Sequence, residues 1–269
     1  ALATGKFFEL EAGQKALNCL PAKYVAGKMM FVRSFVLGLD LDFVAPKLNP
    51  FYNNQTIYDF SALVPMQVMN SIEELKHVKK LIIGGAKVNS NLEKMLSQKN
   101  TESYETYGMT ETVSHIAAKR VGTKEFTVLP NVTIFTDDRG CLNINAPLIS
   151  SETIVTNDLV QIIDENHFIF LGRIDNVINS GGIKFTPEII EEKLASSISP
   201  RFIIAGIPDE KLGEKIVLII EGAAFQLPQN IFKQLDPYEV PKEIFFVDHF
   251  VETENGKIHR KNNIALVLK

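Results

Sequence analysis

Residues 16–21 (ALNCLP) and 79–86 (KKLIIGGA) are short apolar runs that end in proline or glycine, a pattern typical of buried strands. Between and after them the apolar residues recur at helical spacing. Strands that alternate with helices favour an α/β layer built on a parallel or mixed sheet. The segments with helical spacing are 27–39 (GKMMFVRSFVLGL), 71–78 (SIEELKHV), for which Ser71 is the expected N-cap, and 90–98 (SNLEKMLSQ).

From about Val128 the pattern changes to a residue-by-residue alternation of apolar and polar side chains. Segments 132–147 (VTIFTDDRGCLNINAP) and 153–175 (TIVTNDLVQIIDENHFIFLGRID) alternate in this way around the turn sequences DDRG and DEN. Alternation of this kind predicts β structure that is rich in hairpins.

A third pattern begins after Asp175. Residues 186–197 (TPEIIEEKLASS) indicate a helix with Thr186 at the N-cap and Pro187 at the first helical position. The remaining segments predict a small α+β arrangement: strands in 201–222 and 242–250, and a hairpin turn in 254–262 (ENGKIHRKN) around its Asn-Gly dipeptide.

Together these patterns predict an α/β fold in two domains, which also suits a chain of 269 residues. The larger N-terminal domain is expected to cover residues 1–174, with an α/β part (1–127) and a β-rich part (128–174). A small mobile domain is expected to cover residues 175–269.

Charge and hydropathy exclude some classes of partner. The formal net charge of −4 argues against nucleic acid, because binding to a phosphate backbone requires a clustered basic surface. The most apolar stretch, residues 25–39, is interrupted by Lys28 and Arg33, so no membrane span is predicted. No signal peptide pattern is present, and we expect a soluble, cytoplasmic protein. The sequence leaves the oligomeric state open, a homodimer included.

Cysteines and histidines give no sign of a transition-metal site. The two cysteines, Cys19 and Cys141, are far apart in sequence and suit a reducing compartment. The five histidines form no His-x-x-x-His pair and there is no Cys-x-x-Cys.

Residues 103–112 (SYETYGMTET) carry the first candidate chemistry. The segment is too polar for a core strand, and one interpretation is a capped loop in which Gly108 supplies the turn. The alternative is a phosphate and metal site. A glycine allows a ligand to approach the backbone, a threonine hydroxyl can donate to phosphate, and the adjacent carboxylate can bind Mg²⁺.

Four further segments have a structural and a ligand-binding interpretation. The Gly-Gly of 82–88 (IIGGAKV) is either a strand end or bare backbone against a planar group. Asp158 is either part of an Asx turn or an acceptor for two ribose hydroxyls. Residues 172–192 (GRIDNVINSGGIKFTPEIIEE) hold too many special residues for a simple linker. Lys257, in the predicted hairpin turn, either points into water or carries a positive charge to a polyanion.

Taken in order, GGA, YGMTET, TND, GRxDxxIxSGG and NGK resemble the signature series of the adenylate-forming acyl-CoA synthetase superfamily. The resemblance runs along essentially the whole chain. It implies a two-step reaction, in which a carboxylic acid attacks the α-phosphate of ATP and the thiol of CoA then displaces AMP. ATP, Mg²⁺, CoA and a small carboxylic acid are the partners that the resemblance implies.

Within the superfamily, residues 20–41 (LPAKYVAGKMMFVRSFVLGLDL) look most like the o-succinylbenzoate–CoA ligases of menaquinone biosynthesis. The related stretch there is Leu-Pro-x-x-His-x-x-Gly, followed by an apolar segment that carries an arginine. This chain has Tyr24 in place of the histidine, then Gly27 and Arg33, and the resemblance implies that these three residues line the acyl pocket.

The resemblance also implies roles for the other motif residues. Thr110 contacts phosphate, Glu111 binds Mg²⁺, and Lys257 reaches from the small domain to the phosphate and acyl oxygens. Asp175 is the hinge of the small domain, whose rotation replaces Lys257 by the Gly181-Gly182 loop that guides CoA. The residues implied to bind the nucleotide are Gly84, Gly85, Ala86 and Tyr107 at adenine, Asp158 and Arg173 at the ribose, and Gly108 and Met109 without a more particular position.

Arg33 is singled out by physical chemistry as well, because an arginine in an apolar run is costly unless it is paired. It is either a surface residue of the helix that reaches water or a bidentate partner for the second carboxylate of a dicarboxylic substrate.

Three departures from the family pattern bear on these expectations. Asn157 stands where glycine is usual, Tyr24 replaces histidine, and the Gly/Ser/Thr-rich phosphate loop with its lysine is absent from the sequence. We therefore expect a fragment of a longer ligase, with weak nucleotide binding and low or no turnover. The alternatives are a ligase for another aryl or aliphatic acid and a non-catalytic nucleotide-binding module.

Overall fold

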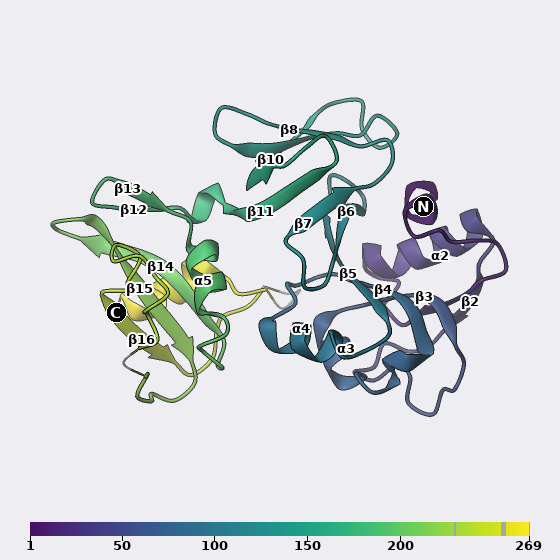
Figure 1. The fold of residues 1–269 in the computed structure, drawn as a ribbon, viewed down its shortest axis with the longest axis horizontal. Helices are drawn as coiled ribbons and strands as arrows, with labels where there is room; N and C mark the ends of the chain where they lie inside the picture. Colours follow the sequence, from purple (N-terminus) through teal and green to yellow (C-terminus); the bar gives the residue numbers. More distant parts are fainter. Residues whose placement is uncertain (229, 254–256, 269) are drawn as a thin grey trace. The chain divides into compact units, whose positions relative to one another are not determined.

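A computed structural model of the chain describes residues 1–228, 230–253 and 257–268 (Figure 1). The described residues form two compact units. Unit 1 comprises Ala1–Asp138, Leu142–Thr156 and Gln161–Phe170, and unit 2 comprises Arg139–Cys141, Asn157–Val160 and Leu171–Lys269. The fold is mixed α/β, as the sequence pattern predicts.

Parallel strands form the first part of the main sheet. The strand order is β2-β1-β3-β4-β5, and each neighbouring pair is parallel. Strands β1, β3 and β4 are almost entirely buried, as expected for a parallel sheet that is covered on both faces. The bounds are β1 Lys15–Asn18, β2 Asp40–Phe43, β3 Tyr58–Leu63, β4 Val78–Ile83 and β5 Glu102–Gly108.

Helices connect these strands and cover the sheet. Helix α2 ends at Gly38, whose φ of 70° gives the left-handed C-cap that glycine adopts without strain. The prediction that Ser71 caps a helix is wrong, because Ser71 lies at the C-cap of α3 and its hydroxyl donates to the carbonyl of Gln67. The bounds are α1 Leu2–Phe7, α2 Val25–Leu37, α3 Pro65–Asn70, the 3₁₀ helix η1 Glu74–His77 and α4 Ser90–Leu96.

The same sheet continues in the order β6-β7-β11-β10-β9-β8, in which the pairs β6–β7, β7–β11 and β8–β9 are antiparallel. The hairpin of β8 and β9 turns at residues 137–140, as the DDRG sequence predicts, and β10 and β11 are joined by the predicted DEN turn. The bounds are β6 His115–Arg120, β7 Glu125–Val128, β8 Thr133–Thr136, β9 Cys141–Asn145, β10 Ile154–Ile162 and β11 His167–Arg173.

Two sequence-based interpretations are wrong in this region. Residues 102–108 form β5, although the segment is too polar to suggest a core strand. The buried Glu105 is neutralised by Lys119 on β6 and accepts a hydrogen bond from the amide of Val88, so the strand can lie within the sheet. Asp158 lies inside β10 and not in an Asx turn.

The second sheet lies in unit 2, in the order β13-β12-β15-β14, with β16 parallel to β15. Thr186 is the N-cap residue of α5 and Pro187 its first residue, as predicted. The predicted Asn255-Gly256 turn lies outside the described residues. The bounds are η2 Ile174–Asn176, β12 Ile178–Ser180, β13 Ile183–Phe185, α5 Pro187–Leu194, β14 Phe202–Asp209, β15 Gly213–Glu221, β16 Glu243–Val247 and α6 Arg260–Val267.

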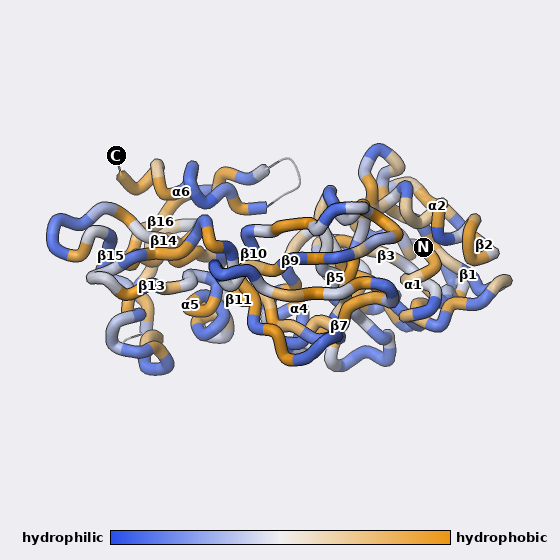
Figure 2. The backbone as a smooth tube through the Cα atoms, turned by 90° about the horizontal axis from the view of Figure 1, so that it is seen from above, coloured by the Kyte–Doolittle hydropathy of each residue, from blue (hydrophilic) through white to orange (hydrophobic). Residues whose placement is uncertain are grey.

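Hydrophobic residues gather on the strands, whereas the connecting loops are largely hydrophilic (Figure 2). Each unit has its own apolar core, one around Leu17, Leu81 and Leu92 and one around Leu218 and Leu194. No helix in the described part of the chain is long and apolar enough to cross a membrane.

Candidate active site

The loop after β5, residues 109–114, is organised by the hydroxyl of Thr112. This side chain is 1% exposed. Its Oγ1 accepts a hydrogen bond from the amide of Met109 at 2.9 Å, and it lies 3.0 Å from the carbonyl of Met109 and 2.7 Å from that of Ser114. One buried hydroxyl therefore closes the loop on itself and fixes the residues between its contacts.

Val113 is the strained residue of this loop. Its φ is 62°, a left-handed value that is unusual for a β-branched residue, and its side chain is exposed. Such a conformation costs about 1–3 kcal/mol and persists only where surrounding contacts impose it. Here the amide of Val113 donates to the carbonyl of Thr110 at 3.0 Å, and Thr112 holds both flanks. Stored strain of this kind is found at ligand sites.

Glycine is required at two positions beside the loop. A Cβ at Gly108 would lie 2.5 Å from the carbonyl oxygen of Ser114, where the pairing of β5 with β6 shifts register. Gly85 has a φ of 87°, and it follows Gly84 at the end of β4. Gly85 and Ala86 are exposed, so the backbone at this strand end is open to a flat ligand.

Thr110 and Glu111 are both exposed on this loop. No group of three His, Cys, Asp or Glu side chains among the described residues could hold a metal ion by itself. A single carboxylate nevertheless suits Mg²⁺, which usually keeps several waters and is bound by one or two carboxylates together with substrate phosphates. The exposed Glu111 therefore fits a magnesium ion that arrives with a nucleotide.

Tyr107, the residue before Gly108, is held by an aromatic cluster. Its ring lies edge-on to Phe168 at 5.2 Å and to Phe126 at 5.9 Å between centroids. Edge-to-face contacts of this kind fix the plane of the ring. The sheet thus presents a half-buried tyrosine of fixed orientation next to the loop.

Arg33 is buried, which overturns the interpretation of a surface arginine that reaches water. Its side chain lies on α2 and is 2% exposed. Nη2 donates to Oγ of Ser114 at 2.9 Å and to Nδ1 of His115 at 3.2 Å, while Nε is buried without a hydrogen-bond partner. No acidic side chain in the described part of the chain pairs with it.

A buried cation of this kind is costly unless an anion joins it. Burial lowers the pKa of Arg33 to about 10, so the guanidinium remains charged at neutral pH. The combination of positive charge, burial and an unpaired Nε is what a site for a ligand carboxylate provides.

His115 completes this cluster as a neutral ring. Burial and the adjacent charge of Arg33 lower the pKa of His115 to about 3. Because Nδ1 faces an Arg33 donor, it acts as the acceptor, and the proton is on Nε2, which lies 3.4 Å from Oγ1 of Thr4. A neutral His115 adds no second positive charge beside Arg33.

Tyr24 and Gly27, the other residues implied for the acyl pocket, lie at the start of α2. Tyr24 is the N-cap residue and is exposed, whereas Gly27 is buried. A Cβ at Gly27 would lie 2.3 Å from the carbonyl oxygen of Pro21, so glycine is needed here for close packing. A role in substrate binding stays a prediction for both residues.

In unit 2, four polar side chains form a chain of contacts around the predicted ribose and hinge residues. Arg173 lies 3.4 Å from Asp158 and donates to Asp175 at 3.2 Å. Nδ2 of Asn157 donates to the same Asp175 carboxylate at 3.2 Å. The hydrogen bond from Arg173 lowers the pKa of Asp175. Asn157 lies in β10 without a positive φ, so its left-handed tolerance is not needed at this position.

The predicted CoA loop is a tight turn between β12 and β13. Gly181 and Gly182 both have positive φ, 61° and 83°, and the amide of Gly181 donates to the carbonyl of Leu212 at 2.8 Å. No atom lies within 4 Å of a Cβ built on Gly182. The turn therefore needs glycine for its backbone conformation, and at Gly182 the side-chain position is open space.

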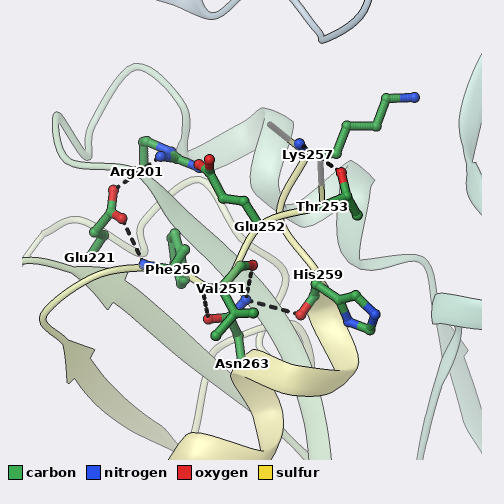
Figure 3. Close-up of polar contacts among 9 residues, drawn as sticks. All are labelled: Arg201, Glu221, Phe250, Val251, Glu252, Thr253, Lys257, His259 and Asn263. Atoms are coloured by element: carbon green, nitrogen blue, oxygen red, sulfur yellow. Dashed lines mark hydrogen bonds and ion pairs between the residues drawn. The ribbon is translucent and has the colours of Figure 1, made fainter. Parts of the chain in front are cut away.

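Lys257 lies on an exposed loop before α6, and its side chain extends away from the polar cluster beneath it (Figure 3). Its amide donates to Oγ1 of Thr253 at 3.2 Å, and its carbonyl accepts from the amide of Thr253 at 2.8 Å. These two hydrogen bonds hold the backbone at Lys257, while its side chain is exposed.

The structure brings together Thr110, Glu111, Tyr107 and Gly108 on one strand and loop, and Asp158, Arg173 and Asp175 in one network. Sequence reasoning missed Thr112, Ser114 and His115. Thr112 lies inside the quoted motif, but its burial is visible only in the fold. Ser114 and His115 reach Arg33 across 81 and 82 residues of sequence, a pairing that no local pattern reveals.

Comparison with solved structures identifies the class of protein. The chain is 36% identical to an AMP-forming acyl-CoA synthetase/AMP-acid ligase II-like protein from Dyadobacter fermentans, with a TM-score of 0.64 and coverage of 99% of this chain and 82% of that one. The chain therefore belongs to the adenylate-forming acyl-CoA synthetase superfamily. No family model matches the chain.

More particular relatives are 2-succinylbenzoate–CoA ligases. Those of Bacillus cytotoxicus and Listeria monocytogenes are 25% and 22% identical, each over 91% of this chain. The chain spans 60% of the length of these curated relatives. The o-succinylbenzoate CoA synthetase of Bacillus subtilis, solved with its acyl-adenylate intermediate, shares the fold at 17% identity, a TM-score of 0.84 and coverage of 97% of this chain and 62% of that one.

Proposed function

We propose that this chain serves an ATP-dependent acid–CoA ligase reaction whose acid is a dicarboxylate, with o-succinylbenzoate as the first candidate. The observation that carries the proposal is the buried, unpaired guanidinium of Arg33 next to the strained loop of Thr110 and Glu111. Membership of the superfamily and the names of the curated relatives support the same chemistry.

The first half-reaction forms an acyl-adenylate. A substrate carboxylate oxygen attacks the α-phosphorus of ATP, the bond to the β-phosphate oxygen breaks, and pyrophosphate leaves. Negative charge grows on the non-bridging phosphate oxygens, so positioning and electrostatic stabilisation lower the barrier. In this proposal Thr110 donates to phosphate, and Lys257 contributes positive charge to the phosphate and acyl oxygens. Glu111 would hold Mg²⁺, which neutralises phosphate charge.

The remaining nucleotide contacts follow the motif residues. Tyr107 and the backbone at Gly84, Gly85 and Ala86 contact adenine, and Asp158 with Arg173 binds the ribose hydroxyls. In the second half-reaction the CoA thiol attacks the acyl carbon and AMP leaves. The turn at Gly181-Gly182 guides CoA, and Asp175 is the hinge of the small domain.

The buried charge of Arg33 is the reason for proposing a dicarboxylic acid as the substrate. One carboxylate of the acid is activated, and the second pairs with the Arg33 guanidinium, whose Nε has no hydrogen-bond partner among the described residues. Ser114 and the neutral His115 hold the guanidinium in place from its Nη2 side. An acid with one carboxylate would leave the buried charge unpaired, which disfavours its binding.

The test is a panel of acids in an ATP–pyrophosphate exchange assay on the protein as its gene encodes it. We expect o-succinylbenzoate to give the highest kcat/KM and its analogue without the distal carboxylate to be at least tenfold worse. An equal or better result with a monocarboxylic acid would assign the chain to a different acyl substrate. Exchange with none of the acids would favour a nucleotide-binding module without catalysis.

A further inference from the structure

Beneath Lys257, the buried side chain of Asn263 contacts both arms of the loop that carries this lysine (Figure 3). The arms are residues 251–253 and 257–259. They are joined directly by a hydrogen bond from the amide of His259 to the carbonyl of Val251 at 2.9 Å, by the bridge between Glu252 and Ile258, and by the two hydrogen bonds between Thr253 and Lys257. Val251, Glu252, Thr253 and Lys257 are exposed and Ile258 and His259 are half-buried, and contacts near the surface hold a loop less firmly than buried ones.

Asn263 lies on α6 and is 0% exposed. Its Oδ1 accepts from the amide of Val251 at 2.9 Å, and its Nδ2 donates to the carbonyls of Val251 at 2.9 Å and of His259 at 3.0 Å. Both amide hydrogens and the oxygen of Asn263 are therefore hydrogen-bonded. Their partners are Val251, where the first arm begins, and His259, where the second arm ends. Among side chains of this size only a neutral amide supplies two donors and an acceptor together.

The helix that carries Asn263 is itself firmly docked. Arg260 donates to the carboxylate of Glu191 at 2.8 Å and to the carbonyl of Ile204 at 2.8 Å. On the other side of the loop, the amide of Phe250 donates to Glu221 at 2.7 Å, and Arg201 forms an ion pair with Glu252. The amide of Asn263 thus links a fixed helix to the base of the Lys257 loop.

We propose that Asn263 is a positioning residue that sets where the amine of Lys257 is delivered during acyl-adenylate formation. The proposal rests on the proposed function of Lys257. It goes beyond that function because the position of the Lys257 amine is then set by a buried residue that contacts neither ATP nor the acid. Because a misplacement of about 1 Å can reduce a rate about a hundredfold, loss of this clamp should act on the step that uses Lys257.

The experiment compares Asn263→Leu with Asn262→Leu. Leucine approximates the shape of asparagine without its donors or acceptor, and the neighbouring Asn262 is exposed, so it is the matched control. Each variant is assayed separately for adenylate formation from ATP and acid, and for thioester formation from preformed acyl-adenylate and CoA. We expect Asn263→Leu to slow adenylate formation roughly 10- to 100-fold and to change thioester formation by less than about twofold. The control should change neither.

A second variant keeps the test valid if Asn263→Leu does not fold. Thr253→Val removes the hydroxyl that accepts from the Lys257 amide at an exposed position, and we expect it to slow adenylate formation by about two- to fivefold with thioester formation unchanged. If Asn263→Leu and Thr253→Val leave the ratio of the two half-reactions at its wild-type value, the positioning role is wrong.

A measurement without activity separates this inference from the proposed function. Tryptic cleavage after Lys257, followed by mass spectrometry of the native protein, reports how tightly the loop is held. We expect cleavage about tenfold faster in Asn263→Leu than in Asn262→Leu. If the wild type forms no adenylate, the proposed function fails, and the cleavage rates alone decide the clamp. Equal cleavage rates would overturn it.

Discussion

The Arg33 cluster and the Lys257 loop both present a positive charge, but they do so in opposite ways. Arg33 is buried on a helix, its pKa lowered by desolvation, and it is held by Ser114 in the loop after β5 and by His115 at the start of β6. Lys257 is exposed, and only its backbone is fixed. A buried charge discriminates between ligands because leaving it unpaired is costly. In the proposed reaction, the exposed charge of Lys257 serves the first step and is withdrawn for the second.

Of all the substitutions, we expect removal of the Lys257 side chain to have the largest effect on the reaction rate. Lys257→Ala should lower the rate of adenylate formation by about 10²–10³-fold, the usual cost of removing one group that stabilises growing negative charge. Thioester formation from preformed acyl-adenylate should stay within about threefold. Stopped-flow or exchange kinetics of the two half-reactions provide the measurement.

The control for that experiment is Lys261→Ala, which removes an exposed lysine of α6 four residues later in the chain. It should behave as wild type in both half-reactions. Equal losses in the two half-reactions of Lys257→Ala would show that this lysine is not confined to the first step.

Substitution of Arg33 should instead change how well the enzyme distinguishes a dicarboxylic from a monocarboxylic acid. Arg33→Met keeps most of the apolar stem and removes the charge, so we expect the KM for o-succinylbenzoate to rise about 10- to 100-fold, as for the loss of a charged hydrogen bond. The KM for its analogue without the distal carboxylate should fall or stay the same. Steady-state kinetics with the two acids measure this difference.

The control is Lys28→Ala, which removes a positive charge from the exposed side of the same helix. It should change the KM for neither acid. A KM for o-succinylbenzoate that hardly moves in Arg33→Met would remove Arg33 from the acyl pocket.

The buried cluster should also make stability dependent on pH. The pKa of His115 is about 3 in the folded state and about 6.5 when unfolded, so between these values the unfolded state binds the extra proton. Stability from a neutral His115 is therefore complete above pH 6.5 and declines as the pH falls. From pH 7.5 to pH 5 the wild type should lose roughly 2 kcal/mol through this group.

Urea denaturation at the two pH values measures this loss, with His115→Gln for comparison. Glutamine can accept from Arg33 without titrating, so its loss between pH 7.5 and pH 5 should be smaller by most of that amount. The same acid sensitivity in both proteins would mean that the half-buried ring of His115 is not held neutral in the folded state.

The smallest effect is expected at the strained loop. Val113→Gly should relieve the left-handed backbone and raise the free energy of unfolding by about 0.5–1 kcal/mol, the strain relieved less the entropy cost of glycine. Asn131→Gly, at a φ of 66° that asparagine tolerates, is the control and should change stability less. Thermal unfolding measures both. A lower melting temperature for Val113→Gly would show that Val113 is not strained.

Sequence alone was sufficient for the α/β class, for the helices α2, α4 and α5, for the strands of residues 132–175, and for the family, because these patterns and motifs are local. It failed at β5, because Glu105 counts as polar until Lys119 on the next strand neutralises it. The predicted N-cap at Ser71 was also wrong. The hydroxyl of Ser71 donates to the carbonyl of Gln67 in α3, so Ser71 ends that helix and does not begin another. Arg33 was recognised as costly, but its burial and its contacts with Ser114 and His115 depend on tertiary packing.

The most direct test of the proposed ligase chemistry is calorimetry of the native protein with ATP and with a non-hydrolysable analogue of the o-succinylbenzoyl adenylate. An enzyme that forms this intermediate should bind the analogue at least about a hundredfold more tightly than ATP. Equal affinity for the two ligands would contradict the account, because a protein that only binds nucleotides has no reason to prefer the intermediate.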